Sequence, residues 1–161
     1  MLNEDLKVNI ENIKISNKQN DFEASLNNSL NLAFVGDAVW TLFVRDYFAN
    51  NTNYKNNFLH RLTTKFVKAS YQAKALEKLQ ESFTELEKDL ARRARNTKMN
   101  TVSKNASLAD YKKATSFEAV IGYLYLTENF DRIKYFFNIL KDDFMGEQKW
   151  LLVVKIVFMK H

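Results

Sequence analysis

The stretch that decides the fold is residues 32–39, Leu-Ala-Phe-Val-Gly-Asp-Ala-Val. Apolar side chains surround it and continue to Phe48 on nearly all sides of a helix, which is typical of a buried helix, here expected over residues 21–50 with Asp21 as its N-cap. One carboxylate, Asp37, lies in the middle of this run, directly after Gly36. Because burial of an unpaired carboxylate is costly, Asp37 needs a partner.

A second segment repeats this arrangement. Residues 115–126, Thr-Ser-Phe-Glu-Ala-Val-Ile-Gly-Tyr-Leu-Tyr-Leu, place Glu118 among apolar side chains, one turn before Gly122. Since a glycine inside a helix costs about 1 kcal/mol relative to alanine, each of these glycines indicates close approach by another group. Two kinds of partner would satisfy the acids: a salt bridge, for example between Asp37 and Arg45, or a divalent metal such as Mg²⁺ held by oxygen ligands.

The rest of the chain predicts an all-α helical bundle. Its 161 residues suit one domain, and they include no proline and three glycines, too few for the tight turns of a β-rich fold. Apolar periodicity predicts further helices over 56–81, 84–95, 110–126 and 130–144, with a Thr84–Glu87 capping box and a chain break at Gly146. We expect an N-terminal arm over 1–21, a domain over 22–146 and an apolar, basic tail over 147–161.

Several classes of function are excluded by what the sequence lacks. Without cysteine and with two histidines, the chain offers no disulfide and no thiolate or histidine zinc site. The sequence contains neither the P-loop motif G-x-x-x-x-G-K nor the Rossmann motif G-x-G-x-x-G, which argues against a nucleotide cofactor. No apolar run reaches the length of a membrane span and no secretory signal precedes the domain, so we expect a cytoplasmic protein.

A basic cluster brackets a polar loop expected over residues 96–109, and the net charge of +5 is compatible with a polyanionic partner. Cations also favour the C-terminal ends of helices, so charge alone does not separate an RNA contact from a solvated helix end. The cluster comprises Arg92, Arg93, Arg95, Asn96, Lys98, Lys104 and Asn105.

Taken together, these motifs resemble a known family. Residues 32–39 resemble the first acidic motif of ribonuclease III-type nuclease domains, and residues 115–126 resemble the second. The runs 59–61, 67–73, 93–98 and 101–105 are similar to the Mini-ribonuclease III branch, which has the nuclease domain without a double-stranded RNA-binding domain. The likeness covers about residues 27–140.

The resemblance implies a homodimeric hydrolase: a Mg²⁺-dependent endoribonuclease, with Mn²⁺ able to substitute, that cleaves double-stranded RNA. In ribosome biogenesis the branch matures the 23S ribosomal RNA precursor. Asp37 and Glu118 would be the catalytic metal ligands, and the basic cluster would bind RNA. Thr115 and His60 are accessory candidates, against the alternatives of a hydroxyl bonded to its own helix and a partly buried structural histidine.

Two positions depart from the larger family. Ala33 and Thr115 stand where full-length ribonuclease III usually has acids, whereas the Mini branch resembles this chain in keeping only the equivalents of Asp37 and Glu118. The departures leave the number of metal ions open. They also motivate an alternative, a non-catalytic nuclease-like dimer that binds structured RNA or ribosomal particles. A third interpretation, a helical protein-interaction domain, depends on the apolar tail.

Overall fold

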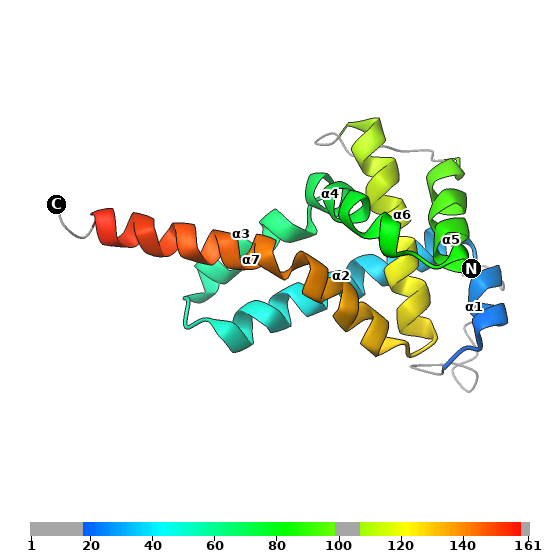
Figure 1. Ribbon diagram of the computed structural model, residues 1–161, viewed down its shortest axis with the longest axis horizontal. Helices are drawn as coiled ribbons and strands as arrows, with labels where there is room; N and C mark the ends of the chain where they lie inside the picture. The colour runs from blue at the N-terminus through cyan, green and yellow to red at the C-terminus, as the bar shows by residue number, and fades with distance from the viewer. Residues whose placement is uncertain (1–17, 99–106, 159–161) are drawn as a thin grey trace, which may run out of the picture.

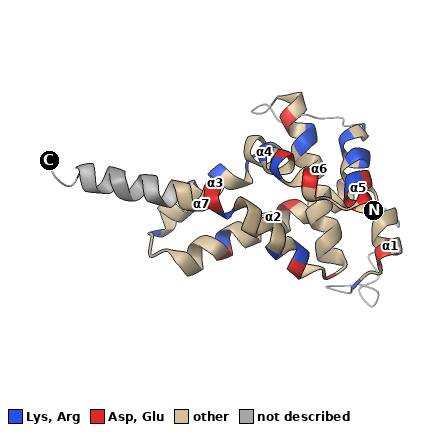
Figure 2. Cartoon of the chain, in the orientation of Figure 1, with Lys and Arg blue, Asp and Glu red and all other residues tan. Residues whose placement is uncertain are grey.

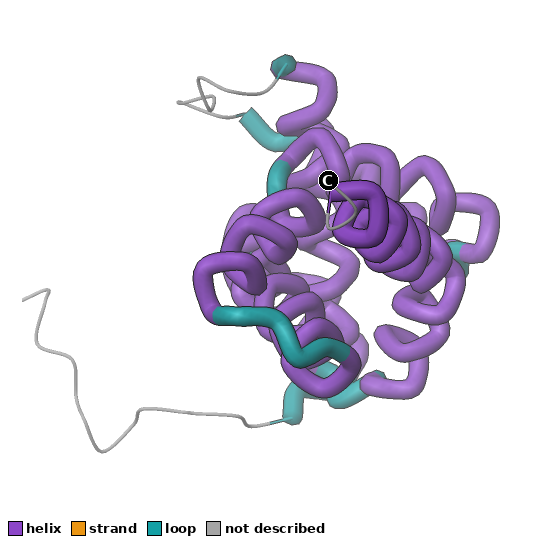
Figure 3. Tube along the Cα trace, turned by 90° about the vertical axis from the view of Figure 1, so that its left-hand side faces the viewer, coloured by secondary structure: helices purple, strands orange, loops and turns teal. Residues whose placement is uncertain are grey.

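The computed structural model describes residues 18–98 and 107–158, and within them it is built from helices and loops, with no strand (Figures 1 and 3). This confirms the predicted all-α class. The helices, in chain order, are α1 (Asp21–Leu26), α2 (Ser29–Asn51), α3 (Asn56–Val67), α4 (Ala69–Leu79), the short 3-10 helix η3 (Gln80–Ser82), α5 (Glu85–Asn96), α6 (Leu108–Leu126) and α7 (Phe130–Phe158). None of the described helices combines the length and the hydropathy that crossing a bilayer would require.

The centre of the bundle is the crossing of α2 and α6 (Figure 1). A Cβ atom added at Gly36 would overlap the carbonyl oxygen of Glu118, and one added at Gly122 would overlap the carbonyl oxygen of Leu32. The two glycines therefore let the helix backbones touch. The expectation that another group approaches each glycine closely is confirmed, and that group is the backbone of the other helix.

Aromatic side chains tie this crossing to the neighbouring helices. Trp40 of α2 is fully buried and meets the ring of Phe117 of α6 edge to face, with 4.9 Å between ring centroids. The ring of Phe66 of α3 stacks on that of Phe144 of α7 at 4.2 Å. Such ring pairs favour fixed relative orientations, so α3 and α7 are held on the central pair.

Each of the two single helices expected over 21–50 and 56–81 is interrupted and forms two helices. Asn20, not Asp21, caps α1, and Asn28 caps α2 by accepting a hydrogen bond from the Leu30 amide at 2.8 Å. A second break falls at Lys68, whose extended backbone separates α3 from α4. The indole of Trp40 donates a 2.8 Å hydrogen bond to the Phe66 carbonyl there, which compensates one of the carbonyls left without a helical partner.

The predicted capping box at the start of α5 is confirmed, since the Glu87 amide donates to the Thr84 hydroxyl and the Thr84 amide donates to Glu87. Glu87 also has a tertiary role that periodicity does not reveal. It is buried and accepts two hydrogen bonds from Arg132 of α7, at 2.8 and 2.9 Å. This buried ion pair fixes the start of α7 against α5.

Two helix ends differ from the expectation. Ser107 caps α6, which begins at Leu108, two residues before the expected start. Gly146 does not end the helix, because α7 continues past it to Phe158. The predicted tail is therefore helical as far as Phe158. Residues 1–17, 99–106 and 159–161, which include most of the predicted arm and loop, lie outside the described residues.

The glycine crossing predicts a large difference between two chemically identical substitutions. Gly36→Ala would force α2 away from α6, so we expect the free energy of unfolding to fall by about 3 kcal/mol or more. Gly146→Ala is the matched control: its Cβ meets nothing within 4 Å in a helix, so stability should rise by about 0.5–1 kcal/mol. Urea unfolding of both variants measures the difference, and equal stabilities would contradict the described crossing.

Candidate metal and RNA site

The two sequence-predicted acids meet at the glycine crossing. Asp37 follows Gly36 on α2, and Gly36 packs directly on the backbone of Glu118 on α6. The carboxyl groups of Asp37 and Glu118 lie within hydrogen-bonding reach of each other. The glycine contact between α2 and α6, where no side chain separates the helices, thus brings together two acids that lie far apart in the chain.

The two acids differ in environment. Glu118 is partly buried, whereas Asp37 is exposed in the single chain, which corrects the expectation that α2 is buried on all sides. Burial raises the pKa of Glu118 to about 8, and the nearby charge of Asp37 acts in the same direction. The Glu118 carboxyl therefore keeps its proton at pH values where a free glutamate has lost it.

A third polar side chain, Gln72 of α4, approaches the same pair. Its amide lies against the Glu118 carboxyl, where it lowers the pKa of that group, although Nε2 does not complete a hydrogen bond of normal geometry. Sequence analysis assigned no role to Gln72. The signal was present: with Ala75, Leu76 and Leu79 it forms the buried stripe of α4, and it is the polar member of that stripe.

The oxygen atoms of the two carboxyl groups fit a hard divalent cation. Mg²⁺ commonly takes one or two protein carboxylates and completes its shell with water. No group of three or more histidine or acidic side chains suited to a metal occurs in the described parts of the chain, so a metal here would be held by the acid pair. Asp37 forms no ion pair with Arg45, the salt-bridge partner considered from the sequence, which instead lines a surface pocket with His60.

The two accessory candidates, Thr115 and His60, differ in burial. Thr115 is buried one turn before Glu118, and its hydroxyl donates to the Tyr111 carbonyl at 3.0 Å, the bond to its own helix that was considered from the sequence. His60 is exposed on α3, so the expectation of a partly buried structural histidine is wrong. Its pocket neighbours, Arg45 and Ala49, lie two to three turns from Asp37 along α2.

The basic cluster divides into structural and exposed members. Arg93 donates to Asp89 at 2.9 Å and to the Ser25 carbonyl at 2.8 Å, which joins α5 to α1, and Arg92 pairs with Asp89 on the surface. The exposed members are Arg92, Arg95 and Asn96 of α5 and Lys98 just after it. Figure 2 shows basic residues in blue along α5. Lys104 and Asn105 lie outside the described residues.

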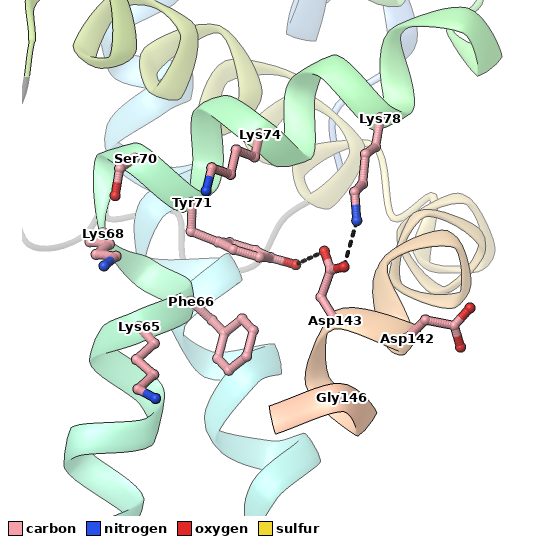
Figure 4. A pocket seen from close by; sticks show the side chains of 10 residues that line it. All are labelled: Lys65, Phe66, Lys68, Ser70, Tyr71, Lys74, Lys78, Asp142, Asp143 and Gly146. Atoms are coloured by element: carbon pink, nitrogen blue, oxygen red, sulfur yellow. Dashed lines mark hydrogen bonds and ion pairs between the residues drawn. The ribbon is translucent and has the colours of Figure 1, made fainter. Parts of the chain in front are cut away.

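A second basic surface lies where α3 and α4 face α7 (Figure 4). Tyr71 donates a 3.0 Å hydrogen bond to Asp143, and Lys78 pairs with the other oxygen of the same carboxylate at 2.5 Å. These bonds close one side of an open pocket. Its other walls carry three lysines: Lys65, Lys68 and Lys74.

Known proteins are similar to this chain in the region that carries the two acids. Residues 30–129, which include both acids, match the Ribonuclease III domain. The chain belongs to the ribonuclease III family. It is 42% identical to Mini-ribonuclease 3 of Thermoanaerobacter sp. (strain X514), over 82% of this chain and 89% of the relative, and 42% identical to that of Staphylococcus aureus, over 74% and 91%.

A solved structure from Fusobacterium nucleatum is similar to this ribonuclease III domain with a TM-score of 0.68 and 33% identity, covering 73% of this chain and 94% of that one. Mini-ribonuclease 3 of Clostridium tetani is 45% identical over 66% of this chain and 72% of its own. These matches place the chain in the Mini-ribonuclease 3 branch, and the protein is an endoribonuclease of ribonuclease III type.

The raised pKa of Glu118 predicts how pH changes the stability of this ribonuclease III domain without metal. Because the folded-state pKa exceeds the unfolded value, the stabilisation is fully present below about pH 4.5 and is lost as pH rises to about 8. Glu118→Gln cannot ionise, so the wild type should lose at least ~1 kcal/mol relative to it across this range. Urea unfolding in EDTA at a series of pH values measures this; parallel stability curves would contradict it.

Proposed function

We propose that the protein is a Mg²⁺-dependent endoribonuclease that cleaves double-stranded RNA. The observation that carries the proposal is the meeting of Asp37 and Glu118 at the glycine crossing, inside the residues that match the Ribonuclease III domain. When Glu118 is ionised, the two like charges are held so close that they favour a divalent cation over a monovalent partner. Mn²⁺, which accepts similar oxygen ligands, would substitute.

Hydrolysis of a phosphodiester is assisted by a divalent cation, which the acid pair could hold. A bound divalent cation neutralises phosphodiester charge, lowers the pKa of attacking water and stabilises the leaving oxygen. Asp37 and Glu118 would hold it, and the products would carry 5′-phosphate and 3′-hydroxyl ends. Thr115 supports the site by packing, since its hydroxyl proton is used within its own helix.

The substrate contacts would come from the exposed end of α5. Duplex RNA is bound through phosphates and 2′-hydroxyls across its minor groove, which cations and amides contact without reading sequence. Arg95, Asn96 and Lys98 are exposed at this end, and Arg92 is exposed beside them. Arg93 serves the fold instead, since it is bonded to Asp89 and to α1. Lys104 and Asn105 stay predictions for the adjoining loop.

The RNA itself would be the precursor of 23S ribosomal RNA, processed in the cytoplasm. What supports this substrate is membership of the Mini-ribonuclease 3 branch together with an α5 surface whose exposed cations can contact phosphates. A duplex is already stacked, so the many aromatic residues have no platform role in binding it. Most of those that the structure describes pack in or against the core.

Neutralising the acids should abolish cleavage and leave the fold intact. With Mg²⁺ and a duplex taken from the paired ends of a 23S precursor, Asp37→Asn and Glu118→Gln should each lower the cleavage rate on the order of 10³-fold, because the ion supplies several kcal/mol of transition-state stabilisation. Asp46→Asn, an exposed acid on the same helix, is the matched control and should cleave normally. Equal cleavage by all four proteins would reject the site; duplex binding that survives EDTA without any cleavage would favour the non-catalytic alternative.

A homodimer completes the proposal. One acid pair per chain cuts one strand, so cutting both strands of a duplex calls for a second copy. The surface for that copy would be a row of exposed apolar residues on one face of α2, Leu30, Phe34 and Leu42, with Phe34 83% exposed. Phe22 and Leu26 on α1 are exposed apolar residues as well. A patch of this kind marks an interaction site, and Phe34 lies one turn from Asp37.

Placing a charge in this row should separate the dimer. Phe34→Glu is expected to raise the dimer dissociation constant by at least ~30-fold, the effect of losing a central aromatic contact worth about 2 kcal/mol. Leu86→Glu, an exposed apolar residue on α5, is the control and should stay dimeric. Analytical ultracentrifugation measures both. A Phe34→Glu protein that dimerises like the wild type would remove this surface from the account.

A further inference from the structure

The buried face of α4 contains one residue that packing does not explain. Gln72 is 1% exposed and lies in the stripe with Ala75, Leu76 and Leu79 that faces α6. Methionine or leucine would fill a similar volume without a polar group. Burying an amide without a well-formed hydrogen bond costs free energy, and Nε2 of Gln72 completes none of normal geometry although it lies against the Glu118 carboxyl. Such a group needs an explanation other than packing.

The surroundings of the amide supply one. Gln72 comes from α4, Glu118 from α6 and Asp37 from α2, and the Glu118 carboxyl has Asp37 and the Gln72 amide as its polar neighbours. The side chain of Glu118 is longer and more flexible than that of Asp37. Once Glu118 has lost its proton, as metal binding requires, the two carboxylates repel each other and would turn apart unless a donor held one of them in place.

We propose that Gln72 is a positioning residue of the metal site: its buried amide keeps the Glu118 carboxylate turned toward Asp37, so that both acids bind one ion. The inference rests on the proposed metal-dependent function. It assigns to Gln72 the part that outer partners of metal ligands play elsewhere, where they orient the ligand and their loss lowers metal affinity 10- to 100-fold. Gln72 itself would touch neither the ion nor the RNA.

The rigid attachment of α4 suits this role. Tyr71, the preceding residue, donates to Asp143 of α7, and Lys78 pairs with the same carboxylate two turns further along α4 (Figure 4). The helix is thus fastened to α7 on one side while Gln72 faces α6 on the other. A donor fixed in this way can restrict a flexible carboxylate better than a surface amide could.

The test measures metal binding directly. Mn²⁺ is titrated into the full-length wild type and Gln72→Met, and free Mn²⁺ is followed by electron paramagnetic resonance. We expect the dissociation constant for Mn²⁺ to rise 10- to 100-fold in Gln72→Met, with an unchanged or higher melting temperature, because an unpaired buried donor has been removed. The Mn²⁺ concentration for half-maximal cleavage should rise by the same factor, while the rate at saturating Mn²⁺ recovers toward that of the wild type.

Controls separate this inference from packing and from the proposed function. Leu76→Met changes the same stripe without an amide and should bind Mn²⁺ like the wild type; a loss equal to that of Gln72→Met would overturn the inference. Gln72→Leu, measured in parallel, guards against a folding defect of one variant. If Glu118→Gln loses Mn²⁺ and both Gln72 variants keep wild-type affinity, the inference alone fails. If Glu118→Gln binds as the wild type does, the proposed site fails with it.

Discussion

The structure depends on the contact between the backbones of α2 and α6. Gly36 and Gly122 have no side chains, and each lies against a carbonyl of the facing helix. Any larger residue would separate the helices, and with them the aromatic contacts that Trp40 makes to the surrounding elements. The same closeness brings the following residue, Asp37, to Glu118. Packing and chemistry are therefore consequences of one geometric constraint, which explains two glycines in helices where each would otherwise be a cost.

The close approach of the acids is unfavourable by itself. A partly buried carboxyl beside an exposed carboxylate keeps its proton at pH values where free glutamate has lost it. The surrounding core is rigid, because rings from four helices interlock around Trp40 and Phe144. The acids therefore cannot relieve their repulsion by moving the helices apart. A divalent cation would relieve it without any movement of the backbone, which is the physical reason for the proposal that these two side chains hold a metal.

Sequence reasoning found what short-range patterns encode. The helical class follows from the lack of proline, and Asp37 and Glu118 stand out because each interrupts an apolar run. Patterns failed where tertiary contacts decide. The break at Lys68 is not visible in the periodicity, since Trp40 and not the local sequence compensates it. Gln72 stands out in the sequence as the polar member of an apolar stripe, but the group it approaches belongs to another helix, so its neighbours in the chain do not show what it contacts.

The central claim is that Asp37 and Glu118 face each other to hold a divalent cation. A crystal soaked in Mn²⁺ and measured at the manganese absorption edge tests it most directly. The account predicts an anomalous density peak between the two carboxylates, with both side chains turned toward it. Density located elsewhere, with the two acids facing different surfaces of the molecule, would contradict it.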